Sequence, residues 1–133
     1  MSGPAAAGLS THVLDLTRGR PAAGMTIELW IGGVQVKTVV TNADGRTDAP
    51  LIDAAVDTFG AGEYELVFHV GDYFAGGSQA GADASAGAGT ADAAAGDRFL
   101  DRVPVRFTIR NTQARYHVPL LCTPWAYSTY RGS

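Results

Sequence analysis

The sequence has one cysteine among its 133 residues and no long apolar run. A single thiol, Cys122, cannot close a disulfide within the chain, which excludes a disulfide-stapled scaffold, and we expect Cys122 to pack as a small hydrophobic residue. No apolar run approaches the roughly 20 residues that a transmembrane helix needs. The start MSGPAAAGLS lacks the basic and apolar stretches of a secretory signal. We therefore expect a soluble cytoplasmic protein that has no membrane partner.

Basic residues are few, and they are scattered along the chain. The 10 Lys and Arg residues against 13 Asp and Glu residues give a net charge of −3, and the sequence shows no basic patch for nucleic acid. The three histidines do not follow HxH or HxxxH spacing, so we expect no metal site. The sequence also lacks a GxSxG motif, a glycine-rich phosphate loop and a paired-cysteine motif. We expect no cofactor.

Alternation of apolar and polar residues recurs along the chain, whereas no segment has the period of a long amphipathic helix. This period-two pattern predicts strands over 25–31, 34–40, 63–70 and 102–110. Each strand has one apolar face that a second layer must cover, so we expect an all-β fold in the form of a two-sheet sandwich. A chain of 133 residues with 46% hydrophobic composition suits one domain over 1–133.

The segment 25–40 predicts a β-hairpin. The stretches MTIELWI and VQVKTVV are joined by Gly32-Gly33, a pair typical of tight two-residue turns. In the second strand, alternation predicts Val34 and Val36 on the apolar face.

Two interruptions break the strand pattern. The stretch 75–97 consists almost entirely of Ala, Gly, Ser and Asp and has nothing to bury, so we expect a flexible surface loop, with a short helix near GDYFA just before it. In TNADGRTDAPL, Asn42, Asp44 and Gly45 predict a tight turn. This turn would hold Arg46 at the edge or end of a sheet.

Two histidines are predicted on faces that also carry aliphatic residues. In LSTHVLD, alternation places His12 on the same face as Leu14, and in YHVPLL it places His117 on the same face as Leu121. Such a mixed face is not typical of a solvated surface, so we expect another subunit to cover it, with polar groups gathered in a cleft. His69, in LVFHV, is interpreted as a hydrogen-bonded structural residue.

Four separated segments carry a family resemblance. LSTHVLD, GRTD, YHVPLL and the terminal YSTYRGS resemble, in the same order, motifs of the transthyretin-related 5-hydroxyisourate hydrolase family. The resemblance implies a transthyretin-like sandwich of two four-stranded sheets with one short helix. It also implies a homotetramer, a dimer of dimers, with active sites at the dimer–dimer interface. The implied activity is hydrolysis of 5-hydroxyisourate to 2-oxo-4-hydroxy-4-carboxy-5-ureidoimidazoline in urate degradation.

The resemblance further implies which residues form the site. Catalysis is expected from His12, Arg46, His117 and Ser133, and substrate binding from His12, Arg46, Tyr130, Arg131 and Gly132. These residue types suit the reaction, because a neutral imidazole can take a proton from water at pH 7 and a guanidinium can stabilise an oxyanion. Either His12 or His117 could be the base, and Arg131 either contacts substrate or anchors the chain end.

Two other functions fit parts of the pattern. A transthyretin-like carrier would bind a small aromatic ligand without chemistry, although the histidines and YRGS favour the enzyme. An immunoglobulin-like interaction module fits the β pattern alone and leaves the motifs unexplained.

The sequence departs from the family pattern at two places. Arg115 stands where the family commonly has histidine, and LLCTP replaces its LLLSP.

Overall fold

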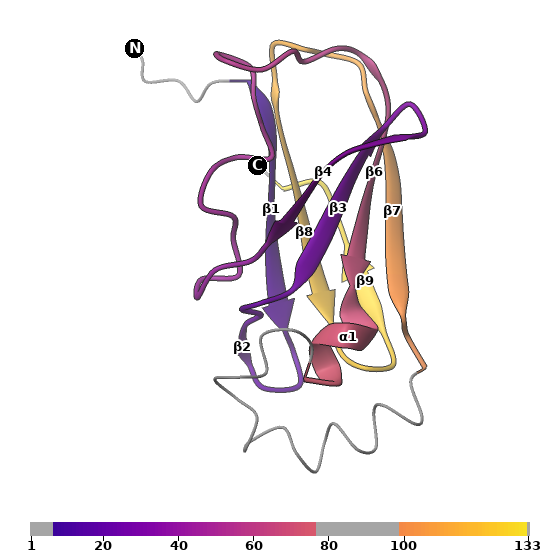
Figure 1. The fold of residues 1–133 in the computed structure, drawn as a ribbon. Helices are drawn as coiled ribbons and strands as arrows, with labels where there is room; N and C mark the ends of the chain where they lie inside the picture. Colours follow the sequence, from indigo (N-terminus) through magenta and orange to yellow (C-terminus); the bar gives the residue numbers. More distant parts are fainter. Residues whose placement is uncertain (1–6, 77–98, 133) are drawn as a thin grey trace.

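The computed structural model describes residues 7–76 and 99–132 (Figure 1). Ser133 and most of the loop expected over 75–97 lie outside the described residues. The described strands are β1 (Gly8–Asp15), β2 (Arg20–Pro21), β3 (Thr26–Ile31), β4 (Val34–Val40), β5 (Ile52–Asp53), β6 (Gly62–His69), β7 (Arg102–Ile109), β8 (Arg115–Cys122) and β9 (Tyr127–Thr129). One short helix, α1 (Val70–Phe74), follows β6 directly. Within the described ranges, no helix is long and apolar enough to cross a membrane.

The strands form two sheets that pack face to face, which confirms the expected two-sheet sandwich with one short helix (Figure 1). One sheet has the order β2-β1-β8-β9, with β5 also paired to β1, and the other has the order β4-β3-β6-β7. The first sheet therefore has five strands rather than the expected four, because two short strands, β5 and β2, pair with the start and the end of β1. Strands β1 and β8 run parallel, and the other pairs are antiparallel.

The core lies between the sheets and is built from the faces that alternation predicts. Buried side chains of the first sheet include Leu9, Val13, Val118, Leu120 and Cys122, and those of the second include Ile27, Leu29, Leu66, Phe68, Val103 and Ile109. Because Cys122 is fully buried, it packs as the small hydrophobic residue expected, and burial raises the pKa of its thiol to about 12. The thiol therefore stays protonated at neutral pH and is no nucleophile.

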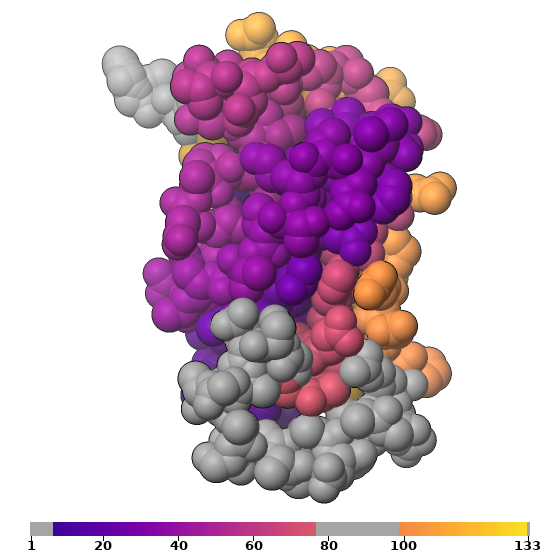
Figure 2. All heavy atoms as spheres, viewed as in Figure 1, coloured from indigo at the N-terminus to yellow at the C-terminus, as the bar shows by residue number. Residues whose placement is uncertain are grey.

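The hairpin of β3 and β4 follows its predicted turn but not its predicted faces. Gly32 and Gly33 have φ values of 58° and 84°, as a two-residue turn requires. Val34 and Val36, expected on a covered face, are 62% and 48% exposed. A register shift opposite Leu29 and Trp30 breaks the alternation, and β4 is an edge strand on the outer side of the fold, as Figure 2 shows.

A buried carboxylate holds the end of β1 to α1. Asp15 is fully buried, and it accepts hydrogen bonds from the Arg18 backbone amide, from the Arg18 guanidinium and from the Tyr73 hydroxyl, the last at 2.7 Å. These donors compensate the charge that Asp15 carries into the interior. The helix expected near GDYFA thus serves to cover one end of the first sheet.

The turn after β4 is fixed to β1 by backbone contacts. Asn42 Oδ1 accepts hydrogen bonds from the backbone amides of Asp44 and Arg46, as the turn chemistry predicts. The Gly45 carbonyl accepts a 2.8 Å bond from the Val13 amide. A Cβ at Gly45 would overlap the Val13 carbonyl oxygen, so only glycine allows this approach. Arg46 is consequently held against β1.

Alanine substitutions at Gly45 and Gly33 distinguish the effect of the close backbone contact at Gly45 from the strain of a positive φ angle alone. Gly45→Ala and Gly33→Ala both place a side chain at positive φ, which costs on the order of 1–3 kcal/mol. Only the Gly45 side chain meets backbone, whereas the Gly33 side chain meets open space. We expect Gly45→Ala to lower the free energy of unfolding by about 2 kcal/mol more than Gly33→Ala in urea denaturation. Equal losses of unfolding free energy in the two variants would contradict the close packing of the Gly45 turn against β1.

Candidate functional site

Parallel pairing of β1 with β8 brings the two predicted histidines to one face of the first sheet. Ser10 lies directly opposite His117, and His12 lies opposite Pro119. The alternate residues Leu9 and Thr11 are buried in the core, so Ser10, His12 and His117 face outward. The histidine face that alternation predicts is therefore confirmed.

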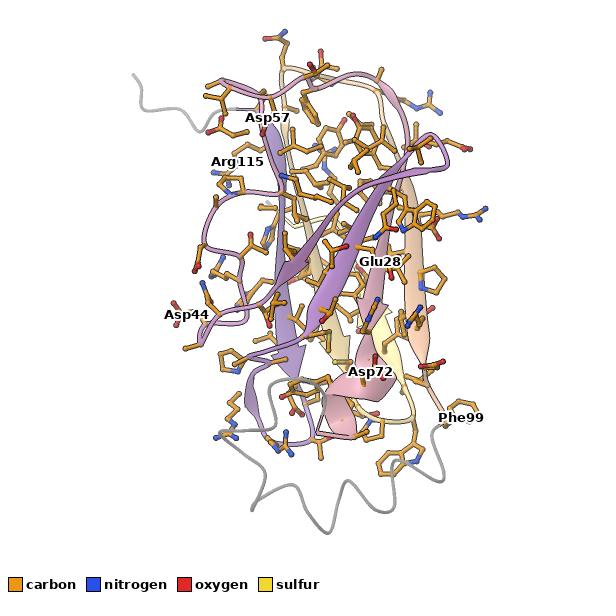
Figure 3. All side chains as sticks on the ribbon, in the orientation of Figure 1. Glu28, Asp44, Asp57, Asp72, Phe99 and Arg115 are labelled. Carbon is orange, nitrogen blue, oxygen red and sulfur yellow. The ribbon has the colours of Figure 1, made fainter. Side chains whose placement is uncertain are left out.

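A cavity of about 530 Å³ opens on this face. Its lining comes from the start of β1, from β5 and the loop before it, and from the start of β8. The lining includes Ser10, Arg46, Asp53, Arg115, Tyr116 and His117. Figure 3 shows Arg115 and Asp44 on the flank of the molecule that carries β1 and this loop. Among the described residues, the cavity lining brings together two of the expected catalytic residues, Arg46 and His117.

His12 lies one strand repeat beyond Ser10 and does not belong to the cavity lining. Its Nε2 atom is 2.9 Å from the backbone carbonyl oxygen of Asp44. Because a carbonyl oxygen only accepts hydrogen bonds, Nε2 is the nitrogen of His12 that carries a proton. The turn that positions Arg46 thus also fixes the His12 ring.

The His117 ring is contacted by β1 and by the C-terminal segment. Its Nδ1 atom is 2.8 Å from Ser10 Oγ. The Gly132 amide donates a 2.7 Å hydrogen bond to the His117 carbonyl, and a Cβ at Gly132 would lie 2.6 Å from ring atom Cδ2. Of the predicted terminal residues up to position 132, which the structure describes, Gly132 is the one that lies against the His117 ring.

Unlike Gly132, the residues Arg131 and Tyr130 do not contact the His117 ring in the contacts described for them. The Arg131 guanidinium donates to the Arg115 carbonyl at 3.1 Å and stacks 4.1 Å from the centre of the Tyr116 ring. Tyr130 is 61% exposed and is not among the residues that line the cavity. These contacts give Arg131 the geometry of an anchor for the chain end, one of the two alternatives that the sequence leaves open.

The surroundings of His117 favour its neutral form. Partial burial lowers the pKa of the imidazole below its usual 6.5, and the charges of Arg46, His12 and Arg115 lower that pKa further. A neutral ring at pH 7 has one nitrogen lone pair available to take a proton. The cavity thus combines a proton acceptor with the guanidinium of Arg46.

Several polar residues that line the cavity, among them Ser10, Asp53 and Arg115, are not among the site residues that the sequence predicts. Ser10 was not singled out, although LSTHVLD places it on the His12 face by simple alternation. Arg115, which stands where the family commonly has histidine, also lines the cavity. His69, in contrast, has the structural role expected of it, since Glu28 Oε2 lies 2.6 Å from its Nε2. Within residues 7–76 and 99–132, no group of three or more acidic, His and Cys residues could hold a metal ion.

The effect of neighbouring charges on the pKa of His117 can be measured by NMR titration. We expect the pKa of His117 below 6.5 in the wild type and closer to 6.5 in Arg46→Met, because a neighbouring cation disfavours the protonated ring. Arg106→Met is the matched control, since Arg106 is 84% exposed on the other sheet. An unchanged His117 pKa in Arg46→Met would show that Arg46 does not face the ring.

Comparison with known proteins gives a family match over nearly the whole chain. The model of the HIUase/Transthyretin family matches residues 9–132. The 5-hydroxyisourate hydrolase of Deinococcus radiodurans is 50% identical over 130 residues, which are 95% of this chain and 96% of the relative.

Solved structures confirm the expected transthyretin-like fold. Klebsiella pneumoniae 5-hydroxyisourate hydrolase has a TM-score of 0.70 at 32% identity, over 96% of this chain and 99% of that chain. (S)-allantoin synthase has a TM-score of 0.76 at 40% identity, but the match covers 97% of this chain and only 44% of that chain. Sea bream transthyretin, solved with thyroxine, has a TM-score of 0.69 at 22% identity over 93% of both chains, which shows the fold alone.

Proposed function

Because the chain belongs to the HIUase/Transthyretin family, we propose that it is an enzyme that hydrolyses 5-hydroxyisourate to 2-oxo-4-hydroxy-4-carboxy-5-ureidoimidazoline in urate degradation. The observation that carries the proposal is the cavity that holds His117 and Arg46 together in a chain so similar to curated hydrolases. We place the reaction in the cytoplasm.

The proposed reaction is the addition of water across a ring carbon–nitrogen bond. The water oxygen bonds to the ring carbonyl carbon, the carbon–nitrogen bond breaks, and the nitrogen receives one proton of the water. The carboxylic acid that forms releases the other proton to solvent and becomes a carboxylate. His117 takes the proton from water as the carbon–oxygen bond forms and returns it to the leaving nitrogen. Arg46 donates to the carbonyl oxygen as its negative charge develops.

Position in the cavity favours His117 over His12 as the base. His12 does not line the cavity, and because its Nε2 donates to the Asp44 carbonyl, only Nδ1 of that ring is available to take a proton. His117 lines the cavity, and its surroundings lower its pKa. We therefore assign His12 to substrate binding and to the electrostatics of the site, since its charge is one of those that lower the pKa of His117.

The terminal residues complete the proposed site. Gly132 allows the chain end to lie against His117, because any side chain there would meet the ring. Arg131 holds this segment through the Arg115 carbonyl and the Tyr116 ring. We keep Ser133 as a catalytic residue because it follows Gly132 directly. Tyr130 remains a substrate-binding residue in the proposal, through a site shared between subunits.

We propose that four chains assemble as a dimer of dimers around this face. The cavity lies on the outer face of the first sheet, and the exposed apolar side chains Leu16, Trp125 and Tyr127 lie toward the other end of the same sheet, near the ends of β1 and β8. A second subunit would cover these residues and exclude bulk water from the reaction. Native mass spectrometry should give the mass of four chains. A mass of one chain at micromolar concentration would contradict the assembly.

The activity is tested by following 5-hydroxyisourate, made from urate by urate oxidase, through its ultraviolet absorbance. We expect the wild type to accelerate the spontaneous decay. Arg46→Ala should slow turnover roughly 100- to 1,000-fold because it removes oxyanion stabilisation. His117→Ala should bring the rate close to the spontaneous baseline, because it removes the proposed base.

Matched substitutions on the other sheet control for the loss of a positive charge and for the loss of an imidazole ring. Arg106→Ala and His69→Gln should keep most of the activity, since both residues lie far from the cavity lining. A wild-type protein that leaves the decay at its spontaneous rate would reject the hydrolase. The same fold would then favour a carrier of a small aromatic ligand, as in the transthyretin structure solved with thyroxine.

A further inference from the structure

Two different contacts determine which way the His117 ring points. Ser10 Oγ lies 2.8 Å from Nδ1, and the close approach of Gly132 covers the ring edge at Cδ2. The imidazole ring of histidine has five atoms, of which Cγ is bonded to Cβ. Once Nδ1 and Cδ2 are covered, Cε1 and Nε2 form the edge of the ring that remains to face the cavity.

From this arrangement we infer that Ser10 is a positioning residue, whose hydroxyl oxygen accepts a hydrogen bond from Nδ1–H of His117 and so holds Nε2 unprotonated toward the cavity. The inference rests on the proposed hydrolase function, and it adds Ser10 to the machinery of that site. Ser10 acts on His117 rather than on the substrate.

The direction of this hydrogen bond follows from what a base must do. A serine hydroxyl can either donate to Nδ1 or accept from it. If Ser10 donated, the single proton of the neutral ring would lie on Nε2, and the nitrogen facing the cavity could not take a proton from water. If Ser10 accepts, the lone pair lies on Nε2, where water in the cavity can reach it.

The accepting arrangement also needs no rearrangement during the reaction. When Nε2 takes a proton, the ring becomes an imidazolium with a hydrogen on each nitrogen. Nδ1–H still points at Ser10 Oγ, and the bond becomes a stronger, charge-assisted one.

The fold leaves Ser10 as the residue of β1 that suits this task. Its Cα lies directly opposite that of His117 in the parallel ladder. The neighbouring hydroxyl, on Thr11, faces the core and donates to the Val118 carbonyl at 2.7 Å. The next residue on the outer face, His12, is bound to the Asp44 carbonyl. The contact between Ser10 and His117 thus follows from strand register rather than from nearness in sequence.

The experiment compares Ser10→Ala, Ser10→Thr and the wild type as full chains. The tautomer of His117 is read without substrate, from imidazole ¹⁵N chemical shifts in long-range ¹H–¹⁵N NMR spectra at pH 7. We expect a protonated Nδ1 and an unprotonated Nε2 in the wild type. Ser10→Ala should shift the population toward the other tautomer, whereas Ser10→Thr, which keeps a hydroxyl, should retain the wild-type pattern.

Steady-state kinetics, which give kcat and KM, provide the second measurement. Ser10→Ala should lower kcat by about tenfold with little change in KM, as expected when one hydrogen bond to the base is lost. Ser10→Thr should recover most of kcat even if Ser10→Ala also loses stability. Thr108→Ala, on the outer face of β7, is the control for loss of an exposed strand hydroxyl and should leave kcat unchanged.

The two readings separate failure of this inference from failure of the proposed function. A wild-type ring protonated on Nε2, or a Ser10→Ala variant with normal kcat in an active enzyme, would overturn the role of Ser10. A wild type without hydrolase activity would overturn the proposed function and the catalytic purpose of Ser10, whatever tautomer the spectra show.

Discussion

Parallel pairing of β1 with β8 is the constraint on which the site depends. The two strands are separated by most of the chain, and Ser10 and His117 stand 107 positions apart in sequence. In-register pairing places them opposite each other and puts His12 on the same outward face. The ladder is held from behind by buried residues of both strands, among them Val13 and Leu120. Packing of the core therefore sets the geometry of a polar surface.

Two further segments are fixed to this pair of strands. The turn before Arg46 is docked on β1 through the contact between Gly45 and Val13, so the guanidinium enters the cavity from a third part of the chain. The chain end returns along β8 through β9, and Gly132 then bonds to the His117 backbone. Glycine at both contacts lets backbone approach where a side chain would not fit. The site is thus assembled largely by backbone contacts.

Alternation in the sequence was enough to predict the two-sheet sandwich and the faces of His12 and His117. It was not enough for β4, where a bulge and an edge position leave Val34 and Val36 exposed. Ser10 was missed because its importance comes from register with a strand far along the chain, which a period of two does not specify. The roles of Arg46 and Gly132 came from family motifs rather than from their local sequence patterns.

The most direct test of the account is a crystal structure with a stable oxidised-purine analogue that lacks the cleavable bond. The proposed mechanism predicts that the analogue lies in the cavity of about 530 Å³, with a carbonyl oxygen toward Arg46 and its reacting edge toward Nε2 of His117. An analogue bound elsewhere, such as in the hollow of about 230 Å³ beside Trp30 on the other sheet, would contradict it.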